Sequence, residues 1–398
     1  MEQWIRSWGY LETNFHEFPI EVQNATQRIF CYNNLRGGKV RLHFSNLYGK
    51  SDLQLAGVTL STALEGERVC TDSMRQVTVE GKGEIVIPAG EELYSDPVEY
   101  PVQPGQWLAV SVYVDKPQTI WGSACCMERC TTRVINRFDG NELWSDGFVG
   151  QEQSQWYAFF RYKTGFQCFY AVNGVEVWTG ENPKVVVAFG DSLTHHGFWS
   201  QALARKLYEK LPGGISVINA GICGNRILHD GSIRSVFGQH YGICGKERLE
   251  RDVFSRGKVD MVLMLMGIND ILHPTAGIAP AWEKVTFSQL WEGLNTCGTL
   301  IHNHGATALV STLLPYWNFQ NLWKEEDDAL RRQVNETLRN QPSGVFDGLV
   351  DLEQVVRDPA LPRALREEYD CGDHLHLNQA GGEAIARSIA PQVEERLL

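Results

Sequence analysis

Long hydrophobic runs are missing from this chain. The longest, residues 261–268, is far too short to cross a lipid bilayer. The first residues lack the basic stretch and the apolar core that together mark a secretory signal. From these two absences we expect a cytoplasmic protein that does not insert into membranes.

Positive charge is also scarce, with 36 Lys and Arg against 48 Asp and Glu and a formal net charge of −12. Nucleic acids and anionic membrane surfaces are held by clustered Lys and Arg. We therefore exclude nucleic-acid and membrane partners and expect a small molecule as the substrate. The sequence leaves the oligomeric state open.

Cysteine pairs of the CxxC kind are absent, although the chain has 10 cysteines. Scattered cysteines in a chain without a secretory signal are more commonly reduced, buried side chains than disulfides. Cys125, Cys126 and Cys130 have an alternative interpretation as metal ligands, but no second pair of His or Cys follows at finger-like spacing. We predict core or loop thiols and no metal site.

The first part of the chain has the period of β-strands. At 398 residues the chain is too long for one ordinary core, and we expect two domains. Up to about residue 180, apolar residues alternate with others, as in Val40, Leu42 and Phe44, and Gly and Pro separate the runs. No segment has the pattern of a long helix. We predict half-buried strands in an antiparallel β-sandwich domain, residues 1–180.

The second part, residues 184–398, alternates continuous apolar strands with helices. The predicted strands cover residues 184–189, 215–220, 259–266, 308–314 and 348–352. We predict three helices. The first has an apolar face of Trp199, Leu203, Leu207 and Leu211, and the last covers residues 380–393. The second begins with a capping box of Thr286 and Gln289 and has an apolar face of Leu290, Leu294, Cys297 and Ile301. Continuous strands separated by helices indicate a parallel sheet covered on both faces.

Polar residues stand where these strands end. Ser192, Gly224 and Asn269 each follow one of the first three strands, and Asp373 and His376 come before the last helix. The ligand crevice of such a sheet lies beyond the carboxyl ends of its strands. We therefore expect these residues to lie together.

The residue types in this group suit acyl transfer from an ester. A serine hydroxyl is a weak nucleophile at neutral pH, and it needs an imidazole to accept its proton and donors to stabilise the charge on the carbonyl oxygen. The spacing of Asp373 and His376 allows the carboxylate to accept from one imidazole nitrogen while the other faces Ser192.

Four segments resemble the sequence blocks of the SGNH hydrolases, also called GDSL esterases and lipases. These segments are Gly190-Asp191-Ser192-Leu193, Gly221-Ile222-Cys223-Gly224-Asn225, Gly267-Ile268-Asn269-Asp270 and Asp373-His374-Leu375-His376. The resemblance implies Ser192 as the nucleophile, His376 as the general base and Asp373 as the carboxylate that orients it. It also implies an oxyanion hole made by the backbone N–H groups of Ser192 and Gly224 and the side-chain amide of Asn269.

The same resemblance has consequences for the fold and for cofactors. It implies a flavodoxin-like three-layer α/β/α catalytic domain that requires no metal or organic cofactor. Further segments, such as residues 40–46 and 94–97, are similar to the subgroup that carries an N-terminal, jelly-roll-like β-sandwich.

Some neighbouring side chains have weaker assignments. Asp191, Asn225 and Trp317 are candidate substrate contacts, with core packing as the alternative for Trp317. Asp270 is expected to fix its loop by hydrogen bonding. The adjacent pair His195-His196 is expected to face solvent in the first turn of a helix.

These observations favour a serine esterase for short acyl groups such as acetyl, because no amphipathic helix or long apolar lid suggests a lipid substrate. The resemblance adds O-acetylated carbohydrates as a possible substrate class. Alternatives are a lipase-like acylhydrolase, an acyltransferase, and a carbohydrate-binding protein with an inert hydrolase domain.

Overall fold

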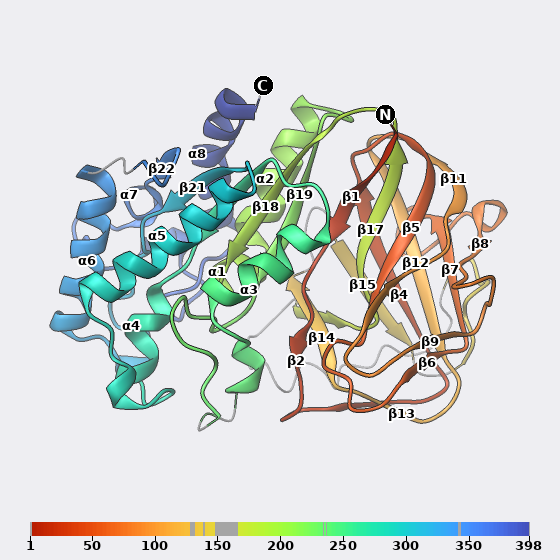
Figure 1. The fold of residues 1–398 in the computed structure, drawn as a ribbon, viewed down its shortest axis with the longest axis horizontal. Helices are drawn as coiled ribbons and strands as arrows, with labels where there is room; N and C mark the ends of the chain where they lie inside the picture. The colour runs from red at the N-terminus through yellow and green to blue at the C-terminus, as the bar shows by residue number, and fades with distance from the viewer. Residues whose placement is uncertain are drawn as a thin grey trace. The chain divides into compact units, whose positions relative to one another are not determined.

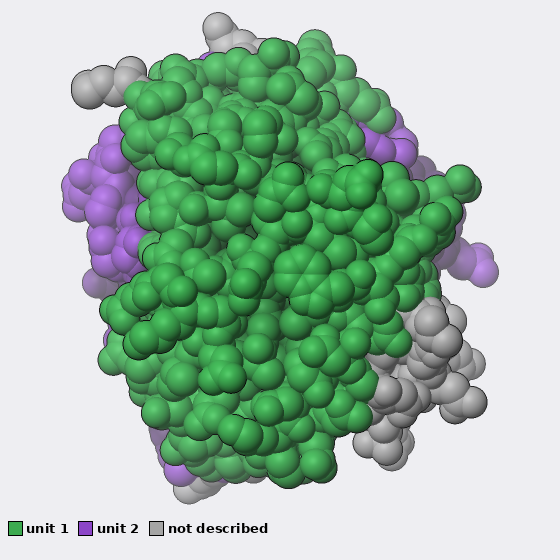
Figure 2. Space-filling view, turned by 90° about the vertical axis from the view of Figure 1, so that its right-hand side faces the viewer, with its two compact units in different colours: residues 1–183, 208–216 green, residues 184–207, 217–398 purple. Residues whose placement is uncertain are grey.

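The chain divides into two compact units in a computed structural model. The structure describes residues 2–127, 132–137, 140–147, 166–233, 235, 237–340 and 344–397. One unit consists of residues 1–183 with 208–216, and the other of residues 184–207 with 217–398. Figure 2 colours them green and purple. Each unit is built around its own kind of sheet.

Antiparallel strands make up the first unit (Figure 1). One sheet has the order β1-β17-β5-β10, with β11 also paired to β5: Gln3–Gly9, Val172–Thr179, Gly37–Ser45, Glu92–Tyr94 and Val98–Val102. A second sheet has the order β15-β4-β12-β7-β8: Thr132–Arg137, Ala25–Asn33, Gln106–Val114, Gly57–Thr62 and Arg75–Gln76. Shorter strands pair as β13 (Gln118–Ile120) with β3 (Ile20–Val22) and β6 (Leu53–Leu55) with β9 (Ile85–Ile87), while β14 (Gly122–Met127) lies between β16 (Phe166–Phe169) and β2 (Thr13–Asn14).

The predicted antiparallel β architecture is confirmed, but the prediction of half-buried strands is too simple. On β12, Ala109 and Ser111 are as buried as the apolar residues between which they alternate. The reason is that connecting segments cover the outer face of this sheet, where Met74 packs in one cluster with Ala109. Within residues 2–183, the helical turn that the structure describes is the short η1, Thr71–Ser73, which agrees with the expected lack of a long helix.

A parallel sheet forms the centre of the second unit. Its order is β19-β18-β20-β21-β22: Ile215–Gly221, Lys184–Gly190, Met261–Leu265, Thr307–Ser311 and Gly348–Val350. The strand that comes second in the chain therefore lies at one edge, beside the first. This is the flavodoxin-like order, in which the ligand crevice opens at the carboxyl end of the first strand, where the winding reverses. The predicted flavodoxin-like α/β fold is confirmed.

The helices of this unit are α1 Ser192–His195, α2 Phe198–Lys210, α3 Gly245–Asp252, α4 Ile268–Thr275, α5 Phe287–Asn303, α6 Glu325–Asn340, α7 Leu352–Val356 and α8 Gln379–Leu397 (Figure 1). The capping box of Thr286 and Gln289 is present at the start of α5, as predicted.

Helix α6 was not predicted, for a physical reason. Four acidic residues fill its first turn, and its buried residues include Asp328 and Arg331 beside the apolar Val334 and Leu338. The two charged groups are an ion pair of 2.8 Å. Because buried charges replace part of the apolar face, few apolar residues mark this helix in the sequence.

Of the three clustered cysteines, the structure describes the side chain of Cys125 alone. Cys125 is buried with its sulfur 3.1 Å from that of Cys168, and both are free thiols. The side chain of Cys126 and the whole of Cys130 lie outside the described residues. Among the helices that the structure describes, none combines the length and apolar character needed to cross a membrane.

Candidate active site

Ser192 occupies a tight turn between β18 and α1. A Cβ atom on Gly190 would overlap the side chain of Thr194 and the carbonyl of Leu265, so glycine is required where the strand ends. The next residue, Asp191, caps the short helix by accepting a 3.0 Å hydrogen bond from the N–H of Leu193. Burial raises the pKa of Asp191 to about 7. The turn holds Ser192 at the carboxyl end of the first strand of the sheet.

Ser192, His376 and Asp373 form one continuous set of hydrogen bonds. The distance from Ser192 Oγ to His376 Nε2 is 2.8 Å, and that from His376 Nδ1 to Asp373 Oδ2 is 2.6 Å. Asp373 Oδ1 also accepts from the backbone N–H groups of Leu375 and His376, at 2.9 and 2.8 Å. The three predicted residues, from two segments that are far apart in the sequence, thus meet at a single point.

The electrostatics of Asp373 suit an orienting carboxylate. Its partial burial would raise its pKa, but the hydrogen bond and charge of His376 and the two backbone donors outweigh this effect and lower the pKa well below the usual range. The carboxylate therefore stays ionised at neutral pH and can stabilise a positive charge on the imidazole.

Gly224 and Asn269 lie in two adjoining loops. Gly224 has a φ of +67°, and an added Cβ would overlap the ring of Tyr241, so two constraints demand glycine there. Asn269, in the first turn of α4, donates from Nδ2 to the carbonyl of Asn225 at 3.1 Å. The predicted donors Gly224 and Asn269 are therefore linked through the residue that follows the glycine.

Two hydrogen bonds join the loop that contains Gly224 to the turn that contains Ser192. The N–H of Ile222 donates to the carbonyl of Gly190 at 3.0 Å, and the N–H of Cys223 donates to Nδ1 of His195 at 3.0 Å. The second bond fixes Nδ1 of His195 as an acceptor. The backbone around Ser192 is thus attached directly to the loop of the next strand.

Asp270 fixes this loop from the opposite side, as predicted. Its two carboxylate oxygens accept from the N–H groups of Ile227, at 2.8 Å, and Leu228, at 3.0 Å. Burial raises the pKa of Asp270 to about 6. Asn269 and Asp270 therefore both bind the same neighbouring loop, one at each end of residues 225–228.

The prediction that His195 and His196 face solvent is wrong. They are 0% and 5% exposed, because α1 is only four residues long and is enclosed by the loops of the site. The ring centroid of His196 lies 4.8 Å from that of His376. Burial, followed by the charge of His376, lowers the pKa of His196 well below its usual value. A neutral ring therefore packs against the imidazole of His376.

Asp191 and Asn225, two of the predicted substrate contacts, are fully buried. The Nδ2 group of Asn225 donates to the carbonyls of Tyr241 and Ile243 at 2.7 and 2.8 Å, and its Oδ1 accepts from Arg248 at 2.7 Å. These bonds give Asn225 a role in holding the loop. Direct contact of either side chain with a substrate stays a prediction.

Trp317 belongs to a partly exposed aromatic group. Its ring lies 4.4 Å from that of Trp323, and the guanidinium of Arg363 stacks 4.1 Å above it. In the same segment, the ring of Phe319 lies 6.2 Å from that of His376. Trp317 is half-buried rather than enclosed in the core, and the loop that carries it borders the imidazole.

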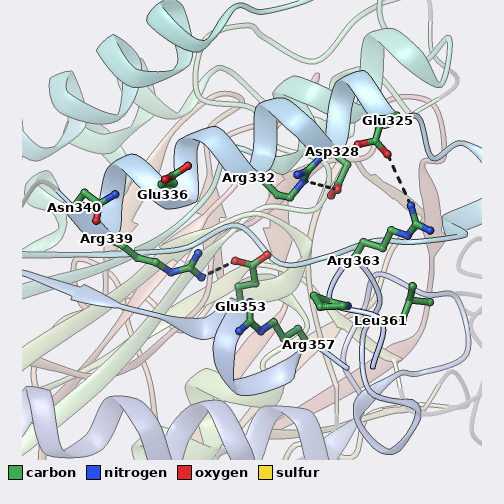
Figure 3. A pocket seen from close by; sticks show the side chains of 11 residues that line it. Glu325, Asp328, Arg332, Glu336, Arg339, Asn340, Glu353, Arg357, Leu361 and Arg363 are labelled. Atoms are coloured by element: carbon green, nitrogen blue, oxygen red, sulfur yellow. Dashed lines mark hydrogen bonds and ion pairs between the residues drawn. The ribbon is translucent and has the colours of Figure 1, made fainter. Parts of the chain in front are cut away.

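A separate groove of about 780 Å³ runs along α6 (Figure 3). Acidic and basic side chains pair across it, with Arg339 to Glu353 at 2.6 Å and Arg332 to Asp328 at 3.0 Å. None of the residues predicted for the active site lines this groove. Because its charges largely neutralise one another, the groove gives no reason to expect an anionic substrate.

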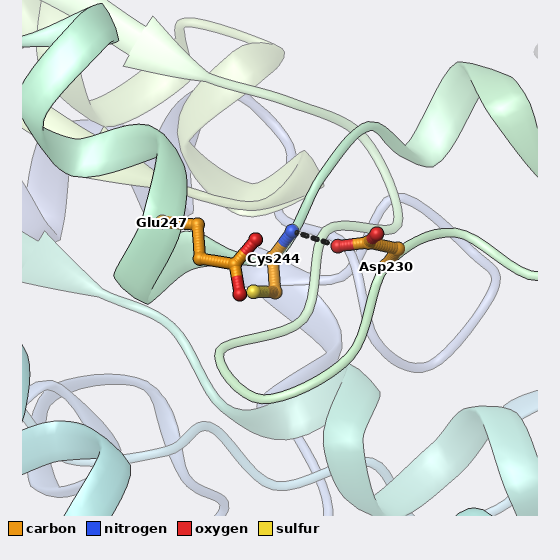
Figure 4. A group of neighbouring side chains, drawn as sticks. All are labelled: Asp230, Cys244 and Glu247. Atoms are coloured by element: carbon orange, nitrogen blue, oxygen red, sulfur yellow. Dashed lines mark hydrogen bonds between the residues drawn. The ribbon is translucent and has the colours of Figure 1, made fainter.

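Asp230, Cys244 and Glu247 place three possible ligand atoms within 4.8 Å of one another (Figure 4). Burial raises the pKa of the Cys244 thiol to about 12, so that the thiol stays protonated at neutral pH. Asp230 accepts from the N–H of Cys244 at 2.8 Å, which explains its position as a loop contact.

A hydroxyl, an imidazole and a carboxylate joined in this order, at the strand ends of an α/β sheet, form the arrangement found in serine hydrolases. Residues 188–384 match the model of the GDSL-like Lipase/Acylhydrolase family. This part of the chain belongs to that family, and the prediction of a GDSL-type ester hydrolase is confirmed at that level.

Solved structures similar to the chain include three esterases or lipases. An aryl esterase from M. smegmatis is 16% identical, with 54% of this chain and 99% of that chain covered and a TM-score of 0.41. An acetyl-xylooligosaccharide esterase from Geobacillus Stearmophilus is 19% identical, with 54% and 96% covered and a TM-score of 0.39. A GDSL-like lipase from Bacteroides thetaiotaomicron is 16% identical, with 53% and 88% covered and a TM-score of 0.38. No curated protein matches the chain.

Proposed function

We propose that this protein is a serine esterase that hydrolyses short-chain carboxylic esters, with Ser192 as the nucleophile, His376 as the general base and Asp373 as the orienting carboxylate. The observation that carries the proposal is the pair of hydrogen bonds centred on His376, 2.8 Å to Ser192 Oγ and 2.6 Å to Asp373 Oδ2. A nucleophile bonded to a base, which is itself oriented by a third group, is the requirement for acyl transfer.

The proposed reaction has two halves. In the first, His376 Nε2 accepts the proton of Ser192 Oγ while the oxygen attacks the ester carbonyl. The tetrahedral intermediate collapses to an acyl-serine, and His376 returns the proton to the departing alcohol. In the second, His376 accepts a proton from a water that attacks the acyl group, and the acid leaves as Ser192 regains its proton. No metal or organic cofactor enters either half.

The negative oxygen of each intermediate requires fixed donors. We assign these to the backbone N–H groups of Ser192 and Gly224 and to Nδ2 of Asn269. The bond from Asn269 Nδ2 to the carbonyl of Asn225 supports this assignment because it holds the amide next to Gly224 before substrate arrives. Preformed donors need no reorganisation during the reaction. This saving is the largest contribution of such a site to the rate.

For the substrate, we propose an acetyl or similarly short acyl ester, with O-acetylated carbohydrate as the alcohol part. The support is the half-exposed Trp317 in the loop whose Phe319 borders His376. Flat aromatic rings offer a rigid surface to sugar rings. We propose direct contact of Trp317 with the alcohol part.

The first test is Ser192→Ala, assayed on 4-nitrophenyl acetate. Loss of the nucleophile should lower kcat by about six decades. The matched control is Ser255→Ala, an exposed serine in the turn η4 (Phe254–Arg256), which should keep full activity. If Ser192→Ala retains most of its turnover, the proposed mechanism is wrong.

The substrate class needs a second assay. Purified protein should be given activated esters from acetyl to decanoyl and a set of acetylated sugars, with products analysed in the presence and absence of added sugar. The proposal expects acetyl to be preferred and free acetate to be released. A preference for long chains would favour a lipase-like enzyme, and transfer of acetyl to the added sugar would favour an acyltransferase.

A further inference from the structure

Arg248, in α3, is a buried arginine that reaches three separate parts of the site. It is 0% exposed. Its Nε donates to Oδ1 of Asn225 at 2.7 Å, its Nη1 to the carbonyl of Ala220 at 3.0 Å, and its Nη2 to the carbonyl of Gly190 at 2.8 Å. Nη1 also lies 3.3 Å from Asp252 Oδ2, and the guanidinium lies 4.1 Å from the ring of Phe189.

The three acceptors belong to the segments that carry the candidate catalytic groups. Gly190 ends β18 just before Ser192, Ala220 lies near the end of β19, and Asn225 directly follows Gly224. A guanidinium is planar, and its donors have a fixed mutual geometry. One side chain therefore fixes the nucleophile turn and the neighbouring loop relative to each other.

A continuous path leads from Arg248 to the proposed oxyanion donors. Asn225 accepts from Arg248 through its side chain, and its carbonyl accepts from Nδ2 of Asn269 at 3.1 Å. The Nδ2 group of Asn225 binds the carbonyl of Tyr241, whose ring packs over Gly224. A displacement of Asn225 would thus move the surroundings of both donors.

We propose that Arg248 is a positioning residue for the oxyanion hole, which acts through Asn225 and touches neither substrate nor reacting atoms. This inference rests on the proposed esterase function. A charged group is costly to bury unless it is fully paired. The hydrogen-bond partners of Arg248 lie in the segments around Ser192 and Gly224. Small errors in the position of catalytic donors are costly to the rate.

The test is Arg248→Lys, which keeps the buried positive charge beside Asp252 but replaces the planar guanidinium and its several donors with a compact ammonium. Active sites are counted by the 4-nitrophenol released when Ser192 attacks diethyl 4-nitrophenyl phosphate. For 4-nitrophenyl acetate, we expect kcat per active site to fall about ten- to a hundredfold, with KM within about twofold. The inhibition constant of phenylboronic acid, which forms a tetrahedral adduct, should rise in the same proportion.

The matched control is Arg251→Lys. Arg251 lies on the same helix and bonds to the same Asp252 at 2.7 Å, but it is partly exposed. This control should keep its kcat per active site. A merely structural role of Arg248 would reduce the number of active sites or the melting temperature and leave kcat per active site unchanged, which would overturn the inference.

Two further variants keep the test decisive if Arg248→Lys folds poorly. Asn225→Ala cuts the same path from its other end and should show the same loss of kcat. When either variant is combined with Asn269→Ala, the double variant should lose less kcat than the product of the two single losses, because the changes share one path. Full additivity, or unchanged kcat in Asn225→Ala, contradicts the proposal.

The parallel assay of Ser192→Ala separates this inference from the proposed function. If that variant keeps its activity, the esterase mechanism and the role of Arg248 both fail. If Ser192→Ala is inactive while Arg248→Lys has normal kcat per active site, only the role of Arg248 fails.

Discussion

Each unit of this protein contains a fully buried arginine that collects hydrogen-bond acceptors, and the two arginines serve different ends. In the first unit, Nε of Arg28 donates to Ser111 Oγ at 2.8 Å, and its other nitrogens bind backbone carbonyls of the segments near residues 67 and 142–146. In the second unit, Arg248 binds the ends of two strands and the loop beside Ser192.

The difference lies in what the acceptors belong to. The acceptors of Arg28 belong to a strand and to connecting segments that cover a sheet, in a unit without any of the proposed catalytic residues. Those of Arg248 belong to the segments that carry the proposed nucleophile and the proposed oxyanion donors. The same chemistry should therefore control stability in one unit and rate in the other.

The largest effect that sharpens this comparison is expected from Asn269→Ala. Loss of one oxyanion donor should lower kcat on 4-nitrophenyl acetate by about two to three decades. KM and the melting temperature should change little, because the amide of Asn269 donates to a single protein carbonyl, that of Asn225. If KM changed while kcat did not, Asn269 would bind the ground state and the oxyanion assignment would be lost.

An intermediate effect is expected from Arg28→Lys. This variant should lower the free energy of unfolding and leave kcat per active site unchanged. The lysine cannot replace the several bonds of the guanidinium, so the free energy of unfolding should fall by about 1–3 kcal/mol. This is measured by denaturant unfolding, with kcat per active site as the second readout. A loss of kcat comparable to that of Arg248→Lys would remove the distinction between the two arginines.

The smallest effect concerns pH. Burial raises the pKa of Asp270 to about 6, above the value near 4 of an unfolded chain. The folded protein therefore retains a proton that the unfolded chain has lost, so the contribution of Asp270 to stability is complete below about pH 4 and is lost as pH rises through about 6. In Asp270→Asn, the fall in unfolding free energy between pH 4 and 7 should shrink by about 2 kcal/mol.

The first unit offers a control of opposite sign for this measurement. Hydrogen bonds from the hydroxyl of Thr78 and the N–H of Gly81 lower the pKa of Asp96. Its contribution is present at neutral pH and is lost as pH falls below about 4. Asp96→Asn should therefore alter only the acid side of the profile. An unchanged profile of Asp270→Asn between pH 4 and 7 would show that Asp270 is not a buried acid with a raised pKa.

The sequence was sufficient to predict the parallel sheet and the meeting of Ser192, His376 and Asp373. Continuous apolar strands identify the sheet, and polar residues placed directly after such strands must come to its edge. The capping box at Thr286 was also visible, because it depends on residues only three positions apart.

Features that depend on partners distant in the sequence were not predictable. His195 and His196 are buried because loops from other strands close over a helix of four residues. Helix α6 replaces part of its apolar face with a charge pair. Arg248 has no local signal at all, since its role depends on acceptors from three segments. A buried charge can be recognised only when its partners are known.

The base and its carboxylate lie within a single turn, residues 373–376, which is closed by two backbone hydrogen bonds to Asp373. The imidazole and the group that orients it therefore move as one piece. A fluctuation of this turn changes the distance from Ser192 Oγ to Nε2 but not the tautomer of the ring. In the proposed mechanism, a substrate that brings Ser192 Oγ and Nε2 together therefore meets an imidazole whose orientation Asp373 already holds.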